Sequence, residues 1–394
     1  MIGPRGAAFP SKNMRNWLLP EFIEDILPIE AARIEFLRGK LLGVFRSYGY
    51  ELVIPPMLEY LESLLTGTGH DLDLRTFKLV DQLSGRMMGL RADITPQVAR
   101  IDAHLLDTGG LTRLCYCGTV LHTRPRGMTA TREPIQAGAE IYGHPGIESD
   151  VEVQSMLFDA LMACGVRASR LDVGHVGVFR ALCRLGNVGH DLESDLQESL
   201  ESKDVARIRN VTVGLNPVVR DAMRSLPELY GDDSVLLRAR NVLPQDPAIA
   251  SALDDLSTLA RASRFDVGID LADLRGYHYH SGAVFAAYVP GSSSAVALGG
   301  RYDDVGKAFG RARPATGFSM DLRELVQVVP AMNNVSSIRA PYSDDPGLAS
   351  EVLRLRSSGE IVITELPGIG GAVWQCDREL AREGSAWVVR RISK

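Results

Sequence analysis

Residues 135–142, with the sequence IQAGAEIY, place Gln136, Gly138 and Glu140 at alternate positions. Side chains two positions apart on a strand point to the same face of a sheet. If this segment is a strand, an amide and a carboxylate point into one space, and the glycine leaves room between them. A carboxylate in such a space can bind an ammonium group through charge-assisted hydrogen bonds. A polar edge strand with solvent-facing Gln136 and Glu140 is the alternative that these residues alone favour.

The composition is that of a soluble globular protein. The 394 residues are 45% hydrophobic and 23% charged, which allows a large core and two or three structural units. The net charge of −6 argues against a domain built mainly to grip a nucleic-acid backbone. The odd number of cysteines, five, does not suggest a disulfide framework. Because the eight histidines show no ligand spacing with them, we expect no bound metal. With no signal-peptide pattern and no apolar run that spans a bilayer, we expect a cytoplasmic protein without a membrane partner.

Hydrophobic spacing and turn residues predict a mixed order of helices and strands. A helix is expected from Ile29 to Tyr48, with Gly49 as its C-cap. Thr95 and Pro96 are typical of the start of a helix, with Thr95 as the N-cap. The other elements expected here are a short strand at 51–56, a hairpin of strands 77–81 and 86–90 around a Ser84-Gly85 turn, strands 113–122 and 135–142, and a helix at 149–164.

The chain is expected to divide near residue 330. Residues 1–330 form the predicted core, and residues 186–263 within it are interpreted as a helical insertion because they are polar with few strand signals. The core resumes with strands at 265–270, 279–289, 295–298 and 314–321. Residues 331–394 begin with a polar link and then predict a strand–helix–strand–helix–strand order, which indicates a small C-terminal α/β unit.

Two segments resemble the signature regions of class II aminoacyl-tRNA synthetases, and of histidyl-tRNA synthetase in particular. They are LHTRPRGMTATREPIQAGAEIYG at 121–143 and PATGFSMDLREL at 314–325. From His122 to Gln136 the spacing matches the synthetase pattern without a gap. The resemblance covers about residues 20–329 and implies an α+β fold, with a class II aminoacyl-tRNA synthetase-like antiparallel sheet flanked by helices, a helical insertion and a small C-terminal α/β unit.

The segment RGYHYHSGAVFAAY, at 275–288, is the most specific match, because its pattern separates histidyl-tRNA synthetase from other class II members. Arg275 is retained, Tyr279 takes the place of the family's first tyrosine, and His280 takes the place of the second. GGRYDD, at 299–304, resembles the family's Gly-Gly-Arg-Tyr-Asp, whose glycines allow close approach to a ligand.

In LRADITPQ, at 90–97, Asp93 stands where the family has its amino-group-binding glutamate, and Thr95 stands where it has threonine. Both residues also fit a role as helix caps, and the two roles are compatible. The resemblance implies a histidine-binding set made of Asp93, Thr95, Gln136, Glu140, Arg275, Tyr279 and His280.

The positions that bind ATP in the synthetases have changed. The family's first signature opens Phe-Arg-x-Glu and its last ends Gly-hydrophobic-Glu-Arg-Leu, whereas this chain has Leu-His-Thr-Arg and Asp-Leu-Arg-Glu-Leu. The two phosphate-binding arginines therefore fall on His122 and Glu324, and Arg124 replaces an acid. Arginine is always ionised and suits the charge that develops on the α-phosphate, while glutamate repels that charge. We expect adenylate formation to be absent.

This combination of features resembles the regulatory subunits of ATP phosphoribosyltransferase. The synthetase-like core keeps the residues that would bind histidine and lacks the arginines that would bind ATP, and a short C-terminal unit follows it. The resemblance implies a subunit of the first step of histidine biosynthesis, with no catalytic residues and no cofactor of its own. Its partner in that family is a short-form catalytic subunit, which transfers a phosphoribosyl group from PRPP to ATP. The family also implies a core dimer within a hetero-octamer, feedback regulation by L-histidine, and no binding of tRNA.

Three alternatives stay open from the sequence. The chain would be an active histidyl-tRNA synthetase if other residues compensate for His122 and Glu324. It would be a synthetase-like regulator of an unrelated partner, because resemblance and not any residue implies the partner. The regulatory histidine would also fit a subunit interface, which would leave the core pocket vestigial.

Overall fold

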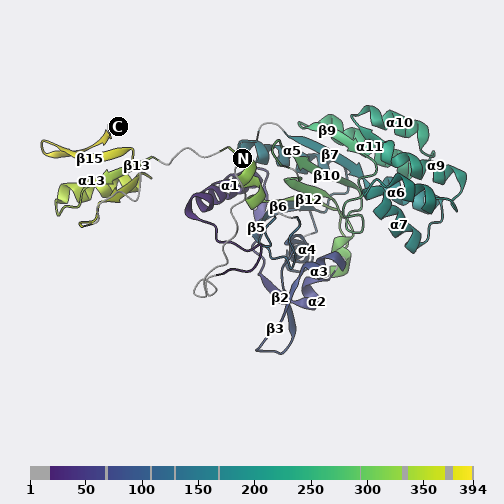
Figure 1. Ribbon diagram of the computed structural model, residues 1–394, viewed down its shortest axis with the longest axis horizontal. Coiled ribbons are helices and arrows are strands. Elements are labelled where there is room, and N and C mark those ends of the chain that lie inside the picture. Colours follow the sequence, from purple (N-terminus) through teal and green to yellow (C-terminus); the bar gives the residue numbers. More distant parts are fainter. Residues whose placement is uncertain are drawn as a thin grey trace, which may run out of the picture. The chain divides into compact units, whose positions relative to one another are not determined.

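The computed structural model describes residues 18–66, 70–106, 109–127, 130–166, 169–292, 294–330, 336–368 and 376–392. The chain folds into two compact units, one that ends at Pro330 and one that begins at Ala331. The first unit, called the core below, contains a large sheet flanked by helices (Figure 1). None of the helices in the described residues is both long enough and apolar enough to span a membrane.

A nine-stranded sheet runs through the core in the order β1-β5-β6-β12-β11-β10-β7-β9-β8. Its strands are β1 (Glu51–Leu52), β5 (Thr112–Thr119), β6 (Ile135–Tyr142), β7 (Arg170–His175), β8 (Tyr230–Gly231), β9 (Asp266–Asp270), β10 (Ala283–Tyr288), β11 (Ala297–Arg301) and β12 (Ala315–Asp321). Neighbouring strands from β5 to β7 are antiparallel, while β1 and β9 add parallel pairs at the two ends of this block. The predicted α+β class with an antiparallel sheet at its centre is confirmed.

The helices of the core lie on both sides of this sheet. Outside the insertion they are α1 (Pro28–Ser47), α2 (Leu61–Leu64), α3 (His70–Arg75), α4 (Thr95–Ile101), α5 (Glu148–Ala163), α6 (Val176–Leu185) and α12 (Leu322–Val328). A small sheet of β2 (Leu58–Tyr60), β4 (Met87–Leu90) and β3 (Phe77–Val80) is built beside them. A π-helical turn at Asp102–Leu106 and a 3-10 turn at Val305–Phe309 complete this part.

Strand β6 divides its side chains between two environments, because alternate residues face opposite sides of a sheet. Ala137, Ala139 and Ile141 are buried in the apolar core that α1, α5 and α12 share. Gln136 and Glu140 point to the other face, on the side where α4 packs. Packing of the apolar face therefore holds β6 in place, and the polar face is available to form a binding site.

Residues 186–263 form a group of helices at one end of the large sheet, next to β7, β9 and β10 (Figure 1). They are α7 (His190–Glu201), α8 (Val205–Val211), α9 (Pro217–Ser225), α10 (Ser234–Val242) and α11 (Pro247–Ala262), with a 3-10 turn at Leu226–Glu228. The segment also supplies strand β8, which pairs with β9. A strand of two residues has no alternation to display, so β8 has no counterpart among the predicted elements.

Two local predictions for the first half of the chain are confirmed. Helix α1 ends at Ser47, and Gly49 follows with φ +83°, a left-handed conformation that favours glycine. Strands β3 and β4 pair as the predicted hairpin, and Gly85 in their turn has φ +71°. These signals are local, which is why the sequence alone identifies them.

The predicted N-cap role of Thr95 is wrong. Thr95 lies inside α4 as its first residue, and its hydroxyl is 3.0 Å from the hydroxyl of Tyr116. Asp93 takes the capping role, because its carboxylate accepts the N–H of Thr95 at 2.9 Å. The threonine side chain is therefore turned toward the polar face of the sheet.

The unit after Pro330 contains β13 (Ser337–Ala340), α13 (Pro346–Ser357), β14 (Ile361–Thr364), β15 (Arg378–Glu383) and β16 (Ala386–Arg391). Its sheet has the order β14-β13-β15-β16, and α13 packs on the apolar face. The described residues of this unit contain one helix where the sequence predicts two. The segment available for the second helix includes residues 369–375, which lie outside the described residues.

An ion pair that ties α5 to the end of β11 gives a test of this packing. Asp150 is 1% exposed and binds Arg301, with Nε–Oδ2 3.0 Å. We expect Asp150→Ala to lower the free energy of unfolding by about 3–5 kcal/mol, because it removes the buried carboxylate of the pair. The buried guanidinium of Arg301 then keeps the longer contact, at 3.3 Å, with the partly exposed Asp303. Urea unfolding followed by far-ultraviolet circular dichroism measures this loss of stability. Asp254→Ala, which breaks an exposed pair with Arg240, is the control and should change stability by about 0.5 kcal/mol or less; equal losses would contradict the assignment.

Candidate functional site

The carboxyl group of Glu140 lies inside the large sheet, 1% exposed, on the strand between β5 and β12. Tyr116 of β5 donates its hydroxyl to Oε1 at 3.0 Å, and Tyr302, which follows β11, donates to Oε2. Gly317 faces Glu140 from β12, and a Cβ there would lie 1.7 Å from Oε2. The space for this carboxyl group therefore depends on a glycine in the neighbouring strand.

Burial raises the pKa of Glu140 to about 8, although the hydrogen bonds from Tyr302 and Tyr116 favour the ionised form. At neutral pH the protein therefore holds a protonated carboxyl group here. A cationic group placed beside it would favour ionisation, because an opposite charge within a few ångströms lowers the pKa of an acid. The site is suited to bind a cation and release a proton.

Gln136 and Asp93 form the next part of the site. Gln136 Nε2 donates to Asp93 Oδ1 at 2.8 Å, and Gln136 Oε1 accepts the backbone N–H of the residue before α4 at 2.9 Å. Asp93 also accepts the N–H of Thr95, whose hydroxyl contacts Tyr116. A continuous hydrogen-bonded network, called the Glu140 network below, thus joins Asp93, Thr95 and Gln136 to Glu140.

Tyr279 and His280 border this network on the side of Tyr302. The ring of Tyr279 lies 5.0 Å from the ring of Tyr302, and its buried hydroxyl has no hydrogen-bond partner among the described residues. The imidazole of His280 stands edge-on to Tyr279 at 5.3 Å, and burial lowers the pKa of His280 to about 4, so the ring is neutral. A buried hydroxyl without a partner is costly, and a polar ligand atom would satisfy it.

Arg275 lies apart from the other expected histidine-binding residues. Its Nε donates to Asp273 at 2.8 Å, and its Nη1 donates to the hydroxyl of Tyr288 at 3.1 Å. Arg275 and Tyr288 line a neighbouring cavity of about 950 Å³. The structure therefore brings all the expected histidine-binding residues together except Arg275.

Other atoms of the protein occupy the space next to Gly300. A Cβ on Gly300 would lie 2.7 Å from the ring of His280 and 2.5 Å from the carbonyl oxygen of Ala283. The glycines of GGRYDD therefore make room for a side chain and for neighbouring strands.

Two of the changed ATP-site positions meet at a second, narrow cavity of about 60 Å³. His122 and Glu324 line it together with Gln136 and Asp321. His122 is 1% exposed, its Nε2 lies 2.9 Å from the carbonyl oxygen of Ala92, and burial lowers its pKa to about 4. Burial also raises the pKa of Asp321 to about 6, with the charge of Glu324 contributing. The neutral imidazole of His122 therefore offers no cation for a triphosphate.

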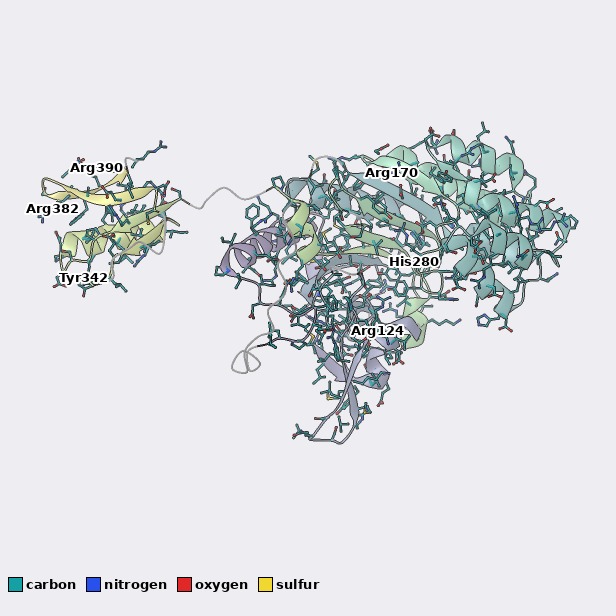
Figure 2. All side chains as sticks on the ribbon, in the orientation of Figure 1. Arg124, Arg170, His280, Tyr342, Arg382 and Arg390 are labelled. Carbon is teal, nitrogen blue, oxygen red and sulfur yellow. The ribbon has the colours of Figure 1, made fainter. Side chains whose placement is uncertain are left out.

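Arginines remain near these cavities at other positions. Arg124 is exposed, lines neither cavity, and lies beside α3 (Figure 2), to which its neighbour Thr123 is hydrogen-bonded. Arg323 is 6% exposed and lines the larger cavity, but its Nη2 binds Glu24 at 2.7 Å. Arg126 is exposed, lines both cavities and has no ion-pair partner among the described residues. Arg323, which precedes Glu324 in the chain, is thus neutralised, whereas Arg126 stays exposed at the lining of both cavities.

Two residues of the site were absent from the sequence-based set. Tyr116 lies opposite Gly138, where a Cβ would come within 2.4 Å of its hydroxyl, and Tyr302 belongs to the GGRYDD segment. The cross-strand pairing that brings Tyr116 to Glu140 is a property of register, which the sequence of one strand does not contain. Tyr302 could have been predicted as a site residue, because it is the tyrosine of the GGRYDD segment.

Two known protein families match different parts of this chain. The family model described as histidyl-tRNA synthetase matches residues 22–325. The family model described as the ATP phosphoribosyltransferase subunit HisZ C-terminal domain matches residues 335–390. The core and the small unit therefore match two different family models, and the second is specific to a phosphoribosyltransferase subunit.

The names of similar proteins distinguish a histidyl-tRNA synthetase from a regulatory subunit. A protein of Ralstonia nicotianae, named ATP phosphoribosyltransferase regulatory subunit, is 60% identical over 96% of this chain and 98% of its own length. One of Cupriavidus metallidurans with the same name is 58% identical over 95% of this chain and 98% of its own length. The chain belongs to the family of ATP phosphoribosyltransferase regulatory subunits. It is a non-catalytic subunit of histidine biosynthesis.

Solved structures show the fold of this regulatory subunit. A structure from Bacillus halodurans, described as an ATP phosphoribosyltransferase regulatory subunit/histidyl-tRNA synthetase, covers 90% of this chain and 94% of its own with TM-score 0.80 and 26% identity. Histidyl-tRNA synthetase from Nostoc covers 90% of this chain and 87% of its own with TM-score 0.73 at 20% identity, which shows the fold alone. The expected class II synthetase-like fold is confirmed.

The raised pKa of Glu140 predicts how stability depends on pH. The folded protein keeps the proton up to about pH 8, whereas an unfolded chain releases it near 4.5. Between these values the folded state holds one more proton, so this group makes the free energy of unfolding fall as pH rises, by at most about 1.4 kcal/mol per pH unit.

Urea unfolding at several pH values tests this prediction with Glu140→Gln as the comparison. The difference in stability between the natural subunit and the variant should fall from pH 5 to pH 8 and stay level above it. Parallel curves for the two proteins would show that Glu140 is ionised when buried and would contradict the prediction.

Proposed function

We propose that this regulatory subunit binds L-histidine at the Glu140 network and passes the state of that site to a short-form catalytic subunit, which transfers a phosphoribosyl group from PRPP to ATP. The observation that carries the proposal is the buried carboxyl group of Glu140 beside the hydroxyl of Tyr279, which has no hydrogen-bond partner in the described part of the chain. A protein interior retains such groups at a cost, and a polar cationic ligand would offset it. The names of the relatives support the choice of partner.

The chemistry of the network suits an amino acid. The ammonium group of histidine can bind Asp93 or Glu140 through charge-assisted hydrogen bonds, since both carboxyl groups belong to one network. The rings of Tyr279 and His280 offer an aromatic wall for the imidazole. Arg275, bound to Asp273, is available to the neighbouring cavity and not to this one.

The altered ATP-binding positions are the reason why we expect histidine to bind without being activated. His122, Arg124 and Glu324 stand at the altered ATP positions, and none of them places a cation in the narrow cavity. The loss of one electrostatic donor costs about 2.7–4 kcal/mol in a transition state, and a reversed charge costs more. An active histidyl-tRNA synthetase is therefore the weaker candidate.

The assembly and location are part of the same proposal. Apolar side chains on α1 and β1, among them Ile29 (83% exposed) and Leu52 (47% exposed), favour a dimer through the synthetase-like core. We place this dimer in a cytoplasmic hetero-octamer with the catalytic subunit and expect no binding of tRNA. Histidine would act by favouring one arrangement of the complex over another, which is the requirement for coupling between two sites.

Reconstitution tests the function. Phosphoribosyl-ATP formation by a purified short-form catalytic subunit is measured with and without this chain across a histidine titration. We expect activity that depends on the chain and is inhibited by histidine. With Glu140→Gln, activity should remain while the histidine concentration for inhibition rises about tenfold to a hundredfold, because a hydrogen bond to a charged group contributes about 1.5–3 kcal/mol.

Glu62→Gln is the matched control, since Glu62 is exposed and its ion-pair partner among the described residues is Arg86, just before β4. It should leave both activity and histidine inhibition unchanged. No effect of the chain at any histidine concentration would reject the partner. Unchanged inhibition with Glu140→Gln would move the regulatory site away from the Glu140 network.

A further inference from the structure

We propose that Tyr277 is a positioning residue that connects the Glu140 network to helix α7, so that histidine binding stabilises this helix of the insertion. The link runs through the tight turn at 275–281, which places side chains in both regions. The inference rests on the proposed function, because it names the element of the subunit that responds to the bound ligand.

The side chain of Tyr277 points away from the ligand site and into the insertion. It is 3% exposed, and its hydroxyl donates to the carboxylate of Glu193 on α7. Its ring lies edge-on to Phe179 of α6 at 5.1 Å, and the guanidinium of Arg180 lies 5.0 Å from the ring centroid. The ring is therefore fixed by α6, while the hydroxyl is the atom that reaches α7.

The backbone of the turn is held from α6 as well. Arg180 Nη2 donates to the carbonyl oxygens of Tyr277 at 2.9 Å and of His280 at 2.7 Å. His280 lies between the large sheet and α6 (Figure 2). Both ends of the four-residue segment from Tyr277 to His280 are thus bound to one guanidinium, which makes the segment move as a unit.

Within the same turn, Tyr279 and His280 point toward the ligand site. Their rings contact each other, and the ring of Tyr279 contacts Tyr302, which donates to Glu140. Gly276 has φ +63°, and a Cβ there would lie 2.7 Å from Nδ1 of His280, so the turn has no spare room. A ligand that orders Tyr279 therefore also orders Tyr277, two residues away in the same turn.

The first half of helix α7 is anchored more weakly than the second. Apart from Glu193, its side chains reach other elements through the partly buried Leu192 and an exposed ion pair of Asp195 with Arg207. The sequence of the helix, HDLESDLQESLE, is mostly polar, and its buried residues, Leu196, Ser199 and Leu200, lie in its second half. Glu193 is in the first turn, where the bond from Tyr277 is made. The first half of α7 therefore depends on this contact more than the second half does, and exchange of its backbone amides reports on the contact.

Hydrogen–deuterium exchange of the full chain, with and without saturating L-histidine, tests the proposal alongside calorimetry of histidine binding. In the natural chain, histidine should slow exchange both at 275–281 and in the first half of α7. Tyr277→Phe keeps the ring and removes the hydroxyl. It should retain the slowing at 275–281 and lose the slowing in α7.

Two variants separate this link from a general loss of stability. Glu193→Gln keeps an oxygen that accepts the Tyr277 hydroxyl, and it should retain the slowing in α7. Tyr230→Phe makes the same chemical change at a 58% exposed position of the insertion and should also retain it. All comparisons use the difference that histidine makes within each variant.

Slowing in α7 that survives Tyr277→Phe at its natural size would overturn the inference. So would slowing that is confined to 275–281 in the natural chain, although that outcome would leave the histidine site in place. Absence of histidine binding in calorimetry would overturn both the inference and the proposed function, so the two failures are distinguishable.

Discussion

A carboxyl group inside a β-sheet needs partners and space, and Glu140 obtains both from neighbouring strands. Gly317 on one side leaves the volume that the carboxyl group occupies, and Tyr116 on the other side donates a hydrogen bond. Tyr302 supplies a second donor from the loop after β11. The apolar face of the same strand packs on α1, α5 and α12, so the carboxyl group is held in place by the main core of the protein.

The Glu140 network and the altered ATP-binding positions share one residue. Gln136 belongs to the Glu140 network and also lines the narrow cavity that His122 and Glu324 share. On the network side the polar groups are joined to one another. On the cavity side Arg323 is bound to Glu24, and Arg126 is exposed at the lining of the cavity. This regulatory subunit thus has a synthetase-like fold in which His122 and Glu324 stand at the positions of the two arginines that activation requires.

Most of the fold was predictable because its signals are local. The alternation in β6, the cap at Gly49 and the turn at Gly85 each depend on a few neighbouring residues, and the structure has them where they were expected. The role of Thr95 was not predictable from its neighbours. Its hydroxyl meets Tyr116, a contact set by the packing of α4 on the sheet, and Asp93 takes over the cap.

The same reason explains which parts of the site were predicted. Gln136 and Glu140 share a strand, so their common face follows from a period of two. Tyr116 reaches Glu140 through cross-strand register, and Arg275 is withdrawn by Asp273, two residues before it. Neither the register nor the competing ion pair is visible in a motif.

The central claim is that this chain recognises histidine but does not activate it. Histidine-dependent exchange of labelled pyrophosphate into ATP measures activation directly, on the chain alone and without any partner. The account predicts no exchange above background at any histidine concentration, because His122 and Glu324 stand where the synthetases have their two phosphate-binding arginines. Exchange that rises with histidine and saturates would contradict it.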